Sequence, residues 1–177
     1  MIRPAARDDI PAITAIYADA VATGTASFEL SAPEESEMSA RMATLLDGGF
    51  PYLVAELGGT VVGYAYAGAY RGRPAYRFTV EDSVYVARTA WGTGVGRALL
   101  ARLIEEAERG GFRQMIAVIG DEASAGSIAL HSALGFEHVG VLRAVGWKHD
   151  GWRATVLMQR ALGSGDSDAP GREPGRR

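Results

Sequence analysis

One stretch of the sequence limits the fold more than any other: an extended segment that runs through a glycine-rich turn into a helix. Residues 81–86 form the extended segment and residues 91–96 form the turn. The apolar spacing of Leu99, Leu100 and Leu103 predicts a helix directly behind the turn. Backbone N–H groups and a helix N-terminus together suit a phosphorylated ligand. A carboxylate at the head of the strand suggests chemistry beside that ligand.

The spacing of the glycines decides which kinds of phosphate site remain. A P-loop needs Lys followed by Ser or Thr after its last glycine, but Gly96 is followed by Arg97. The dinucleotide pattern Gly-x-Gly-x-x-Gly also fails. Counted from Gly92 it requires a third glycine at Arg97, and counted from Gly94 it requires one at Leu99. The turn can still direct N–H groups at one pyrophosphate; a plain strand-to-helix connection is the alternative.

The rest of the chain alternates between extended and helical patterns, which predicts a single α/β (α+β) domain with helices on both faces of a mixed sheet. This domain is expected to span residues 1–162, and residues 163–177 lack apolar periodicity and are expected to form a disordered tail. Helices are predicted at 9–22, around 38–46, at 95–109 and at 124–133. Strands are predicted at 2–3, 52–57, 60–66, 78–86, 115–119, 136–143 and 154–162, with residues 147–152 connecting the last two.

Composition excludes several classes of function. A net charge of -3 gives no reason to expect a nucleic-acid partner, and the absence of cysteine removes thiolate nucleophiles and thiolate metal sites. The three histidines are not at metal-ligand spacing, so no metal is expected. No apolar run approaches the roughly 20 residues of a membrane span, and the N-terminus has no signal-peptide pattern. We therefore expect a cytoplasmic protein without a membrane partner.

Three motifs in sequence order resemble the GCN5-related N-acetyltransferases (GNAT superfamily). They are Ser83-Val84-Tyr85-Val86, the turn and helix start at 92–100, and Leu130-His131-Ser132-Ala133-Leu134-Gly135-Phe136. More narrowly, the chain resembles the phosphinothricin and methionine sulfone/sulfoximine acetyltransferases, with further matches at 18–25, 79–81, 117–119 and 146–152. The resemblance covers residues 1–162 and implies a mixed, mostly antiparallel sheet flanked by helices.

The resemblance implies acetyl-CoA as the acetyl donor and no metal. The pyrophosphate would lie on the turn, and the pantetheine arm would lie along the strand, where backbone N–H groups polarise the thioester carbonyl. The chain departs from relatives at Trp91, where they often have Gln or Arg, and at Ser124, where they have Asn. The implied cofactor-binding residues are Val84, Tyr85, Val86, Gly92, Thr93, Gly94, Val95, Gly96, Arg97, Ser124 and Ser127.

Two residues match catalytic positions of the family. Glu81 would take the proton that the substrate ammonium must lose, and strand alternation puts it on one face with Thr79, Ser83 and Tyr85. The alternative is a solvent-facing strand glutamate. His131 stands where many relatives have a tyrosine that protonates the leaving thiolate, so the resemblance implies a catalytic or substrate-orienting role.

The resemblance also implies a small amino-acid substrate of the phosphinothricin or methionine sulfone/sulfoximine type, with Phe28, Arg71, Arg73 and Tyr76 around its pocket. Arginine grips carboxylate and phosphinate groups bidentately; a solvated loop at 70–77 and a lid role for Phe28 are the alternatives. Other function hypotheses are acetylation of a protein N-terminus, a polyamine or an antibiotic, and a non-catalytic acyl-CoA-binding module. Relatives are commonly dimers, so we expect a homodimer.

Overall fold

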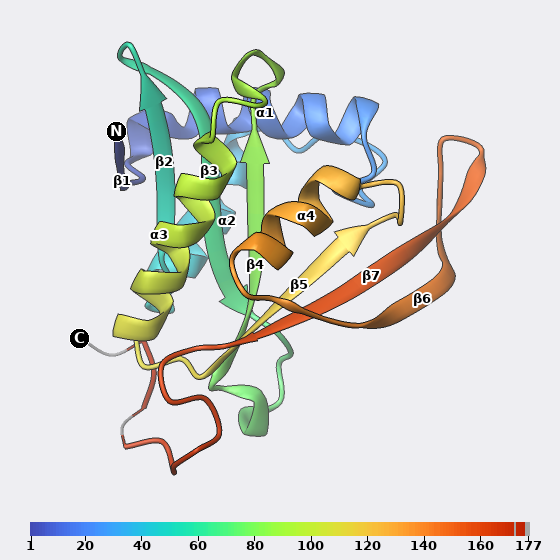
Figure 1. The fold of residues 1–177 in the computed structure, drawn as a ribbon. Helices are drawn as coiled ribbons and strands as arrows, with labels where there is room; N and C mark the ends of the chain where they lie inside the picture. Colours follow the sequence, from blue (N-terminus) through green and yellow to red (C-terminus); the bar gives the residue numbers. More distant parts are fainter. Residues whose placement is uncertain (172, 176–177) are drawn as a thin grey trace.

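Seven strands form one sheet in the order β1-β2-β3-β4-β5-β7-β6 (Figure 1). The computed structural model describes residues 1–171 and 173–175. Strands β4 and β5 are parallel, and the other neighbouring strands are antiparallel, which confirms the mixed, mostly antiparallel sheet. The strands are β1 (Ile2–Pro4), β2 (Tyr52–Leu57), β3 (Thr60–Ala69), β4 (Thr79–Val86), β5 (Gln114–Gly120), β6 (Glu137–Lys148) and β7 (Gly151–Ala161).

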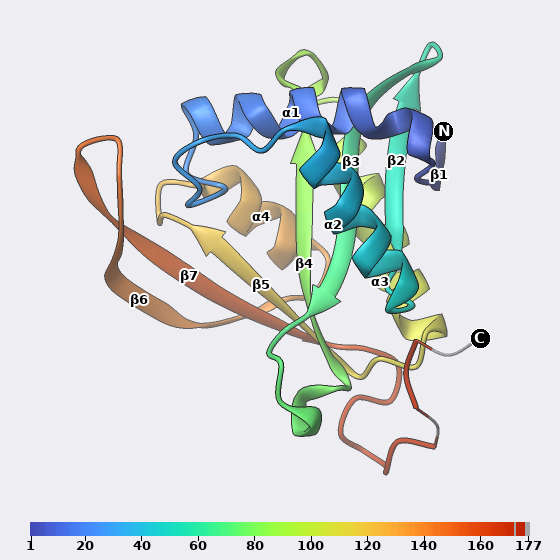
Figure 2. The ribbon, with the colours of Figure 1, turned by 180° about the vertical axis from the view of Figure 1, so that it is seen from behind.

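Helices cover both faces of this sheet, as predicted. Figure 1 shows α3 and α4 in front of the sheet, and Figure 2, the view from behind, shows α1 and α2 on the opposite face. The side of α3 holds a core that includes Leu99, Leu103 and Met115, and the side of α1 and α2 holds a second core around Tyr64. In the described part of the chain, no helix combines the length and apolarity needed to cross a membrane. The helices are α1 (Ile10–Thr23), α2 (Glu35–Asp47), α3 (Val95–Arg109) and α4 (Ala125–Ala133).

The hairpin of β6 and β7 is longer than the sequence predicts. Residues 147–152 were expected to be a connection, but only His149 and Asp150 form the turn, both with positive φ (51° and 52°). Trp147 and Trp152 are opposite each other in the two strands, with ring centroids 5.4 Å apart in an edge-to-face arrangement. This cross-strand aromatic contact favours continued pairing up to the turn.

The parallel pair β4 and β5 opens part-way along its length. Paired positions run from Thr79 and Gln114 to Asp82 and Ala117. Beyond that point the two strands diverge, as Figure 1 shows. The edge of β4 that faces β5 therefore has no recorded strand partner past Asp82, and backbone groups there are available to a ligand.

The segment after residue 162 touches the domain in several places. Arg113 donates to the carbonyl of Gly165 and forms an ion pair with Asp168. Arg77 forms an ion pair with Glu173 at 3.2 Å. The disordered tail stays a prediction.

Candidate active site

A groove of about 640 Å³ runs between the end of β4, the glycine turn, the start of α4 and the end of α1. All the residues predicted to bind the cofactor line this groove except Thr93 and Arg97. The hydroxyl of Thr93 instead donates to the carbonyl of Ala90 at 2.6 Å, and Arg97 is exposed at the start of α3. The structure thus brings the turn, the strand and Ser124 and Ser127 at the start of α4 to one surface; their contact with a cofactor stays a prediction.

The glycine turn presents unpaired N–H groups to this groove. Gly94 is the N-cap of α3 and has φ +86°, in the left-handed region that favours glycine. No atom lies within 4 Å of the position that a Cβ on Gly94 would occupy, so its backbone is open. Ala98 donates back to Gly94, whereas the N–H groups of the first helical turn have no intrahelical acceptor. This geometry, with the helix dipole, fits a diphosphate.

Trp91 lies along the groove, next to the glycine turn. The residue is 66% exposed, and its Nε1–H donates to the carbonyl oxygen of Val86 at 2.9 Å. The guanidinium of Arg88 lies 5.8 Å from the ring centroid. Trp91 therefore offers the groove an aromatic face that is fixed against the end of β4.

A smaller cavity of about 120 Å³ lies where β4 and β5 diverge. Ser124, Ser127, Val84 and Tyr85 line both this cavity and the groove, so the two adjoin. The structure brings Glu81 and His131 together on this cavity, as well as Asp82. A larger cavity of about 980 Å³ lies between the ends of α2 and α3 and contains neither catalytic candidate.

Glu81 reaches the small cavity from the α1–α2 side of the sheet. It is half-buried rather than open to solvent. Burial raises the pKa of Glu81, and the charge of the adjacent Asp82 raises it further. A carboxylate with a raised pKa is closer to the ideal strength for a general base at neutral pH.

His131 reaches the cavity from the other face, on α4. The side chain is buried, and its Nε2 lies 2.9 Å from Oδ2 of Asp82. Its Nδ1 lies 2.7 Å from the carbonyl oxygen of Ser127. Burial lowers the pKa of His131, but the hydrogen bond and charge of Asp82 and the bond to Ser127 outweigh it, so the net shift is upward.

Asp82 is a buried carboxylate that the sequence analysis did not single out. It lies on β4 between Val80 and Val84, both of which contact the core under α3. A signal was present, because an acidic residue between two core-facing valines on alternating strand positions must face a buried partner. Only the fold identifies that partner as His131, 49 residues away in sequence.

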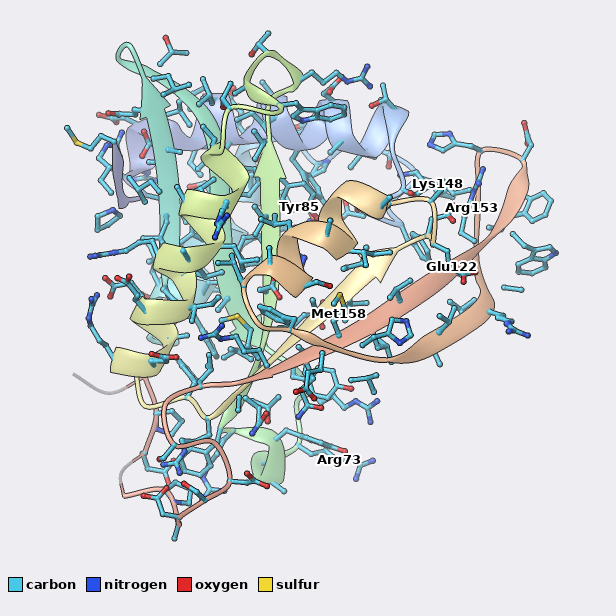
Figure 3. The ribbon with its side chains drawn as sticks, in the orientation of Figure 1. Arg73, Tyr85, Glu122, Lys148, Arg153 and Met158 are labelled. Carbon is cyan, nitrogen blue, oxygen red and sulfur yellow. The ribbon has the colours of Figure 1, made fainter. Side chains whose placement is uncertain are left out.

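The loop after α1 covers the neighbouring end of the sheet. Thr25 donates to the carbonyl of Gly120 at 3.0 Å, and Lys148 donates to the carbonyl of Ser27 at 2.6 Å. The Phe28 ring lies so close to Gly146 that a Cβ there would overlap it. Phe28 thus packs beside the small cavity without lining it. Lys148, labelled in Figure 3, is 4% exposed, and burial lowers its pKa.

The remaining predicted substrate residues lie near the start of β4, away from the glycine turn. Arg71 stacks on the rings of Tyr70 and Tyr76, 5.0 and 5.5 Å from their centroids. Arg71 and Arg73 line a separate cavity of about 280 Å³ that does not include Glu81. Figure 3 shows Arg73 well apart from Tyr85. The structure does not bring these residues together with Phe28 or Glu81, and their role stays a prediction.

The sequence is similar to that of several known acetyltransferases. Residues 13–136 match the acetyltransferase (GNAT) family. The chain is 56% identical over 169 residues to a phosphinothricin N-acetyltransferase of Alcaligenes faecalis, covering 96% of this chain and 86% of that protein. It is 41% identical over 162 residues to the L-methionine sulfoximine/L-methionine sulfone acetyltransferase of Pseudomonas aeruginosa, covering 91% and 94%.

A solved structure agrees with the sequence relatives. The crystal structure of a GNAT superfamily phosphinothricin acetyltransferase from Sinorhizobium meliloti in complex with acetyl-CoA superimposes with a TM-score of 0.95, at 47% identity over 98% of this chain and 94% of that chain. The matched motifs, the fold and the identity over nearly the whole length agree. The chain therefore belongs to the acetyltransferase (GNAT) family.

Proposed function

We propose that this protein transfers the acetyl group of acetyl-CoA to the α-amino group of a small amino acid of the phosphinothricin or methionine sulfone/sulfoximine type. Relatives that bear those names support the substrate class. The observation that carries the proposal is Glu81, a half-buried carboxylate on a cavity that adjoins the groove of the glycine turn. That position suits a base that prepares an amine next to a thioester.

Each step of the reaction is assigned to a different group of the site. Glu81 takes a proton from the substrate ammonium, because only the free amine has an electron pair for attack. The nitrogen then forms a C–N bond to the acetyl carbon, and the C–S bond breaks with its electron pair going to sulfur. Backbone N–H groups along 84–86 stabilise the developing oxyanion. His131 lies on the opposite wall and acts toward the leaving sulfur.

An acceptor panel with acetyl-CoA and a thiol readout tests this function. Phosphinothricin, methionine sulfone or methionine sulfoximine as the acceptor should give faster release of CoA thiol than ordinary amino acids, because arginine can bind the phosphinate, sulfone or sulfoximine oxygens as well as the carboxylate. Spermidine, a short peptide and an aminoglycoside in the same panel test the other acetyltransferase hypotheses. If no acceptor reacts while calorimetry shows acetyl-CoA binding, the protein is an acyl-CoA-binding module and the proposal is wrong.

We propose that the enzyme is a cytoplasmic homodimer that uses β6 and its hairpin as the interface. The absence of cysteine suits a reducing compartment. Apolar side chains that are about half exposed gather on this hairpin, which is unusual for a free surface. They are Val139, Leu142, Val145, Trp147 and Trp152.

Light scattering after gel filtration tests the dimer. Val145→Glu should convert a dimer to a monomer, because a buried unpaired charge at an interface is strongly unfavourable. Leu30→Glu is the matched control, since Leu30 is 78% exposed and lies outside the hairpin, in the loop before α2. A monomeric wild type, or loss of the dimer in both variants, would contradict this interface.

A further inference from the structure

The imidazole of His131 lies between two hydrogen-bond acceptors. Nδ1 faces the carbonyl oxygen of Ser127 at 2.7 Å, and Nε2 faces Oδ2 of Asp82 at 2.9 Å. A carbonyl can only accept, and an ionised carboxylate can only accept. A neutral imidazole has one N–H, so it would leave one ring nitrogen lone pair directed at an oxygen lone pair. With Asp82 ionised, both contacts are favourable at once only if both ring nitrogens carry protons.

We propose that Asp82 is a positioning residue that holds His131 as an imidazolium in the resting enzyme, and that this cation stabilises the departing CoA sulfur. Only the role of the cation toward the CoA sulfur rests on the proposed function; the charge state of His131 does not. Glu81 and His131, on the two sides of the small cavity, then have opposite roles in proton transfer. Glu81 removes the substrate's proton, and His131 is unable to act as a base because both of its nitrogens are already protonated.

Burial makes the partnership between Asp82 and His131 nearly exclusive. The two side chains are 2% and 5% exposed, so solvent does not screen the pair. Oδ1 of Asp82 has no hydrogen-bond partner among the described residues. Among these residues, His131 is the group that forms an ion pair with this carboxylate. The Phe136 ring packs edge-to-face on the imidazole with centroids 4.9 Å apart. An uncompensated buried carboxylate would be costly, and the imidazolium supplies the missing charge.

Glu81, the neighbour of Asp82 on β4, lines the same small cavity as the pair. The partners recorded for the ring on α4 and at the start of β6 are Ser127 and Phe136, which are uncharged. On β5, Ala117 is paired with Asp82. The groups that raise the pKa of His131 against the effect of burial are Asp82 and the backbone of Ser127.

The position of the pair fits a role toward sulfur. His131 and Asp82 line the small cavity, and Ser127, the hydrogen-bond partner of His131, also lines the groove. When the C–S bond breaks, its electron pair moves to sulfur, where a nearby cation lowers the energy of the negative charge. His131 keeps its protons in this step; the thiolate takes up the second proton that the attacking nitrogen loses as the amide forms.

The direction of the pH dependence follows from the raised pKa of His131. The proton is fully present at low pH and is lost as the pH rises through the raised value. Activity that depends on the imidazolium therefore falls on the alkaline side, above the pH at which an ordinary histidine titrates. The same proton contributes to stability below that pH, and this contribution disappears on the alkaline side.

Histidine-selective NMR of the resting wild-type protein tests the charge state without any turnover. His131→Gln assigns its signals against His138 and His149. We expect both ring nitrogens of His131 to be protonated at neutral pH. A neutral His131 at that pH, including a neutral imidazole beside a protonated Asp82, would overturn the proposal.

Asp82→Asn supplies the second measurement. The asparagine amide can donate to Nε2, so the ring should become a neutral Nδ1–H imidazole with its position retained. We expect kcat to fall about 100-fold, KM for acetyl-CoA to stay near the wild-type value, and the alkaline limb of the pH profile to move to lower pH. Asp8→Asn, at an exposed aspartate, is the matched control and should change none of these.

The outcomes separate the two proposals. If Asp82→Asn does not fold, the double variant Asp82→Asn/His131→Gln removes both charges and should restore folding, as expected for an ion pair. An unshifted pH profile and unchanged kcat in a folded Asp82→Asn protein would refute the catalytic half. A wild type that acetylates no acceptor but shows a protonated His131 would refute the proposed function and leave the charge assignment intact.

Discussion

Replacing Glu81 with glutamine is expected to lower turnover by about 10²- to 10⁴-fold, the range for loss of a general base. Glutamine keeps the size and polarity of the side chain but cannot accept the proton of the substrate ammonium. Burial and the charge of Asp82 raise the pKa of Glu81, so the wild-type rate should rise with pH through that raised value. The variant should lose this acidic limb. Initial rates of thiol release across the neutral pH range measure both effects.

Stability provides a check that the lost activity is chemical. A carboxylate whose pKa is raised in the folded state weakens folding once the pH exceeds its unfolded value. Glu81→Gln should therefore melt at the same temperature as the wild type or higher at neutral pH. Glu137→Gln, on an exposed strand position, is the control and should retain full activity. Near-wild-type turnover in Glu81→Gln would remove Glu81 from the role of base.

Gly94→Val is expected to weaken acetyl-CoA binding by about 10- to 100-fold. A side chain at this N-cap would stand in the open space where an anion must approach the turn. Losing one hydrogen bond to a charged oxygen costs about 1.5–3 kcal/mol, which corresponds to that range. Isothermal titration calorimetry measures the affinity directly, and unchanged affinity would refute the pyrophosphate assignment.

A matched glycine separates binding from backbone strain. Gly59, in the turn between β2 and β3, has φ +80° and has open space where a Cβ would lie, as Gly94 does with φ +86°. Valine at either position carries a similar left-handed strain of about 1–2 kcal/mol. Gly59→Val should therefore lower the melting temperature without changing the affinity for acetyl-CoA. If both variants lose affinity equally, general destabilisation explains the effect.

Local patterns in the sequence were sufficient for the parts of the site that are continuous in the chain. The strand, glycine turn and helix of residues 79–109 form one unit, and glycine spacing alone excluded two nucleotide-binding patterns. The family resemblance then pointed to acetyl-CoA. The hairpin turn at His149 and Asp150 was missed because a Gly- and Asp-containing cluster resembles a loop, whereas the Trp147 and Trp152 rings favour pairing across it.

Contacts between distant segments were beyond the sequence pattern. The partner of Asp82 is visible only in the fold, where α4 places His131 against β4. Arg71, Arg73 and Tyr76 were grouped with Phe28 from the family resemblance, but the fold separates them along the length of β4. Such placements depend on where strands diverge and loops return, which neither periodicity nor composition specifies.

The burial of Lys148 bears on a side reaction, the acylation of the protein's own amines. It is the only lysine among 177 residues, and the fold encloses it under the loop that contains Ser27. A protein that binds activated acetyl groups is at risk of acylating its own surface amines. Apart from Lys148, however, the basic side chains counted among Lys and Arg are all arginines. The guanidinium of arginine stays protonated and is not an acyl acceptor. Composition and burial together thus leave this protein without an exposed lysine amine that acetyl-CoA could acylate.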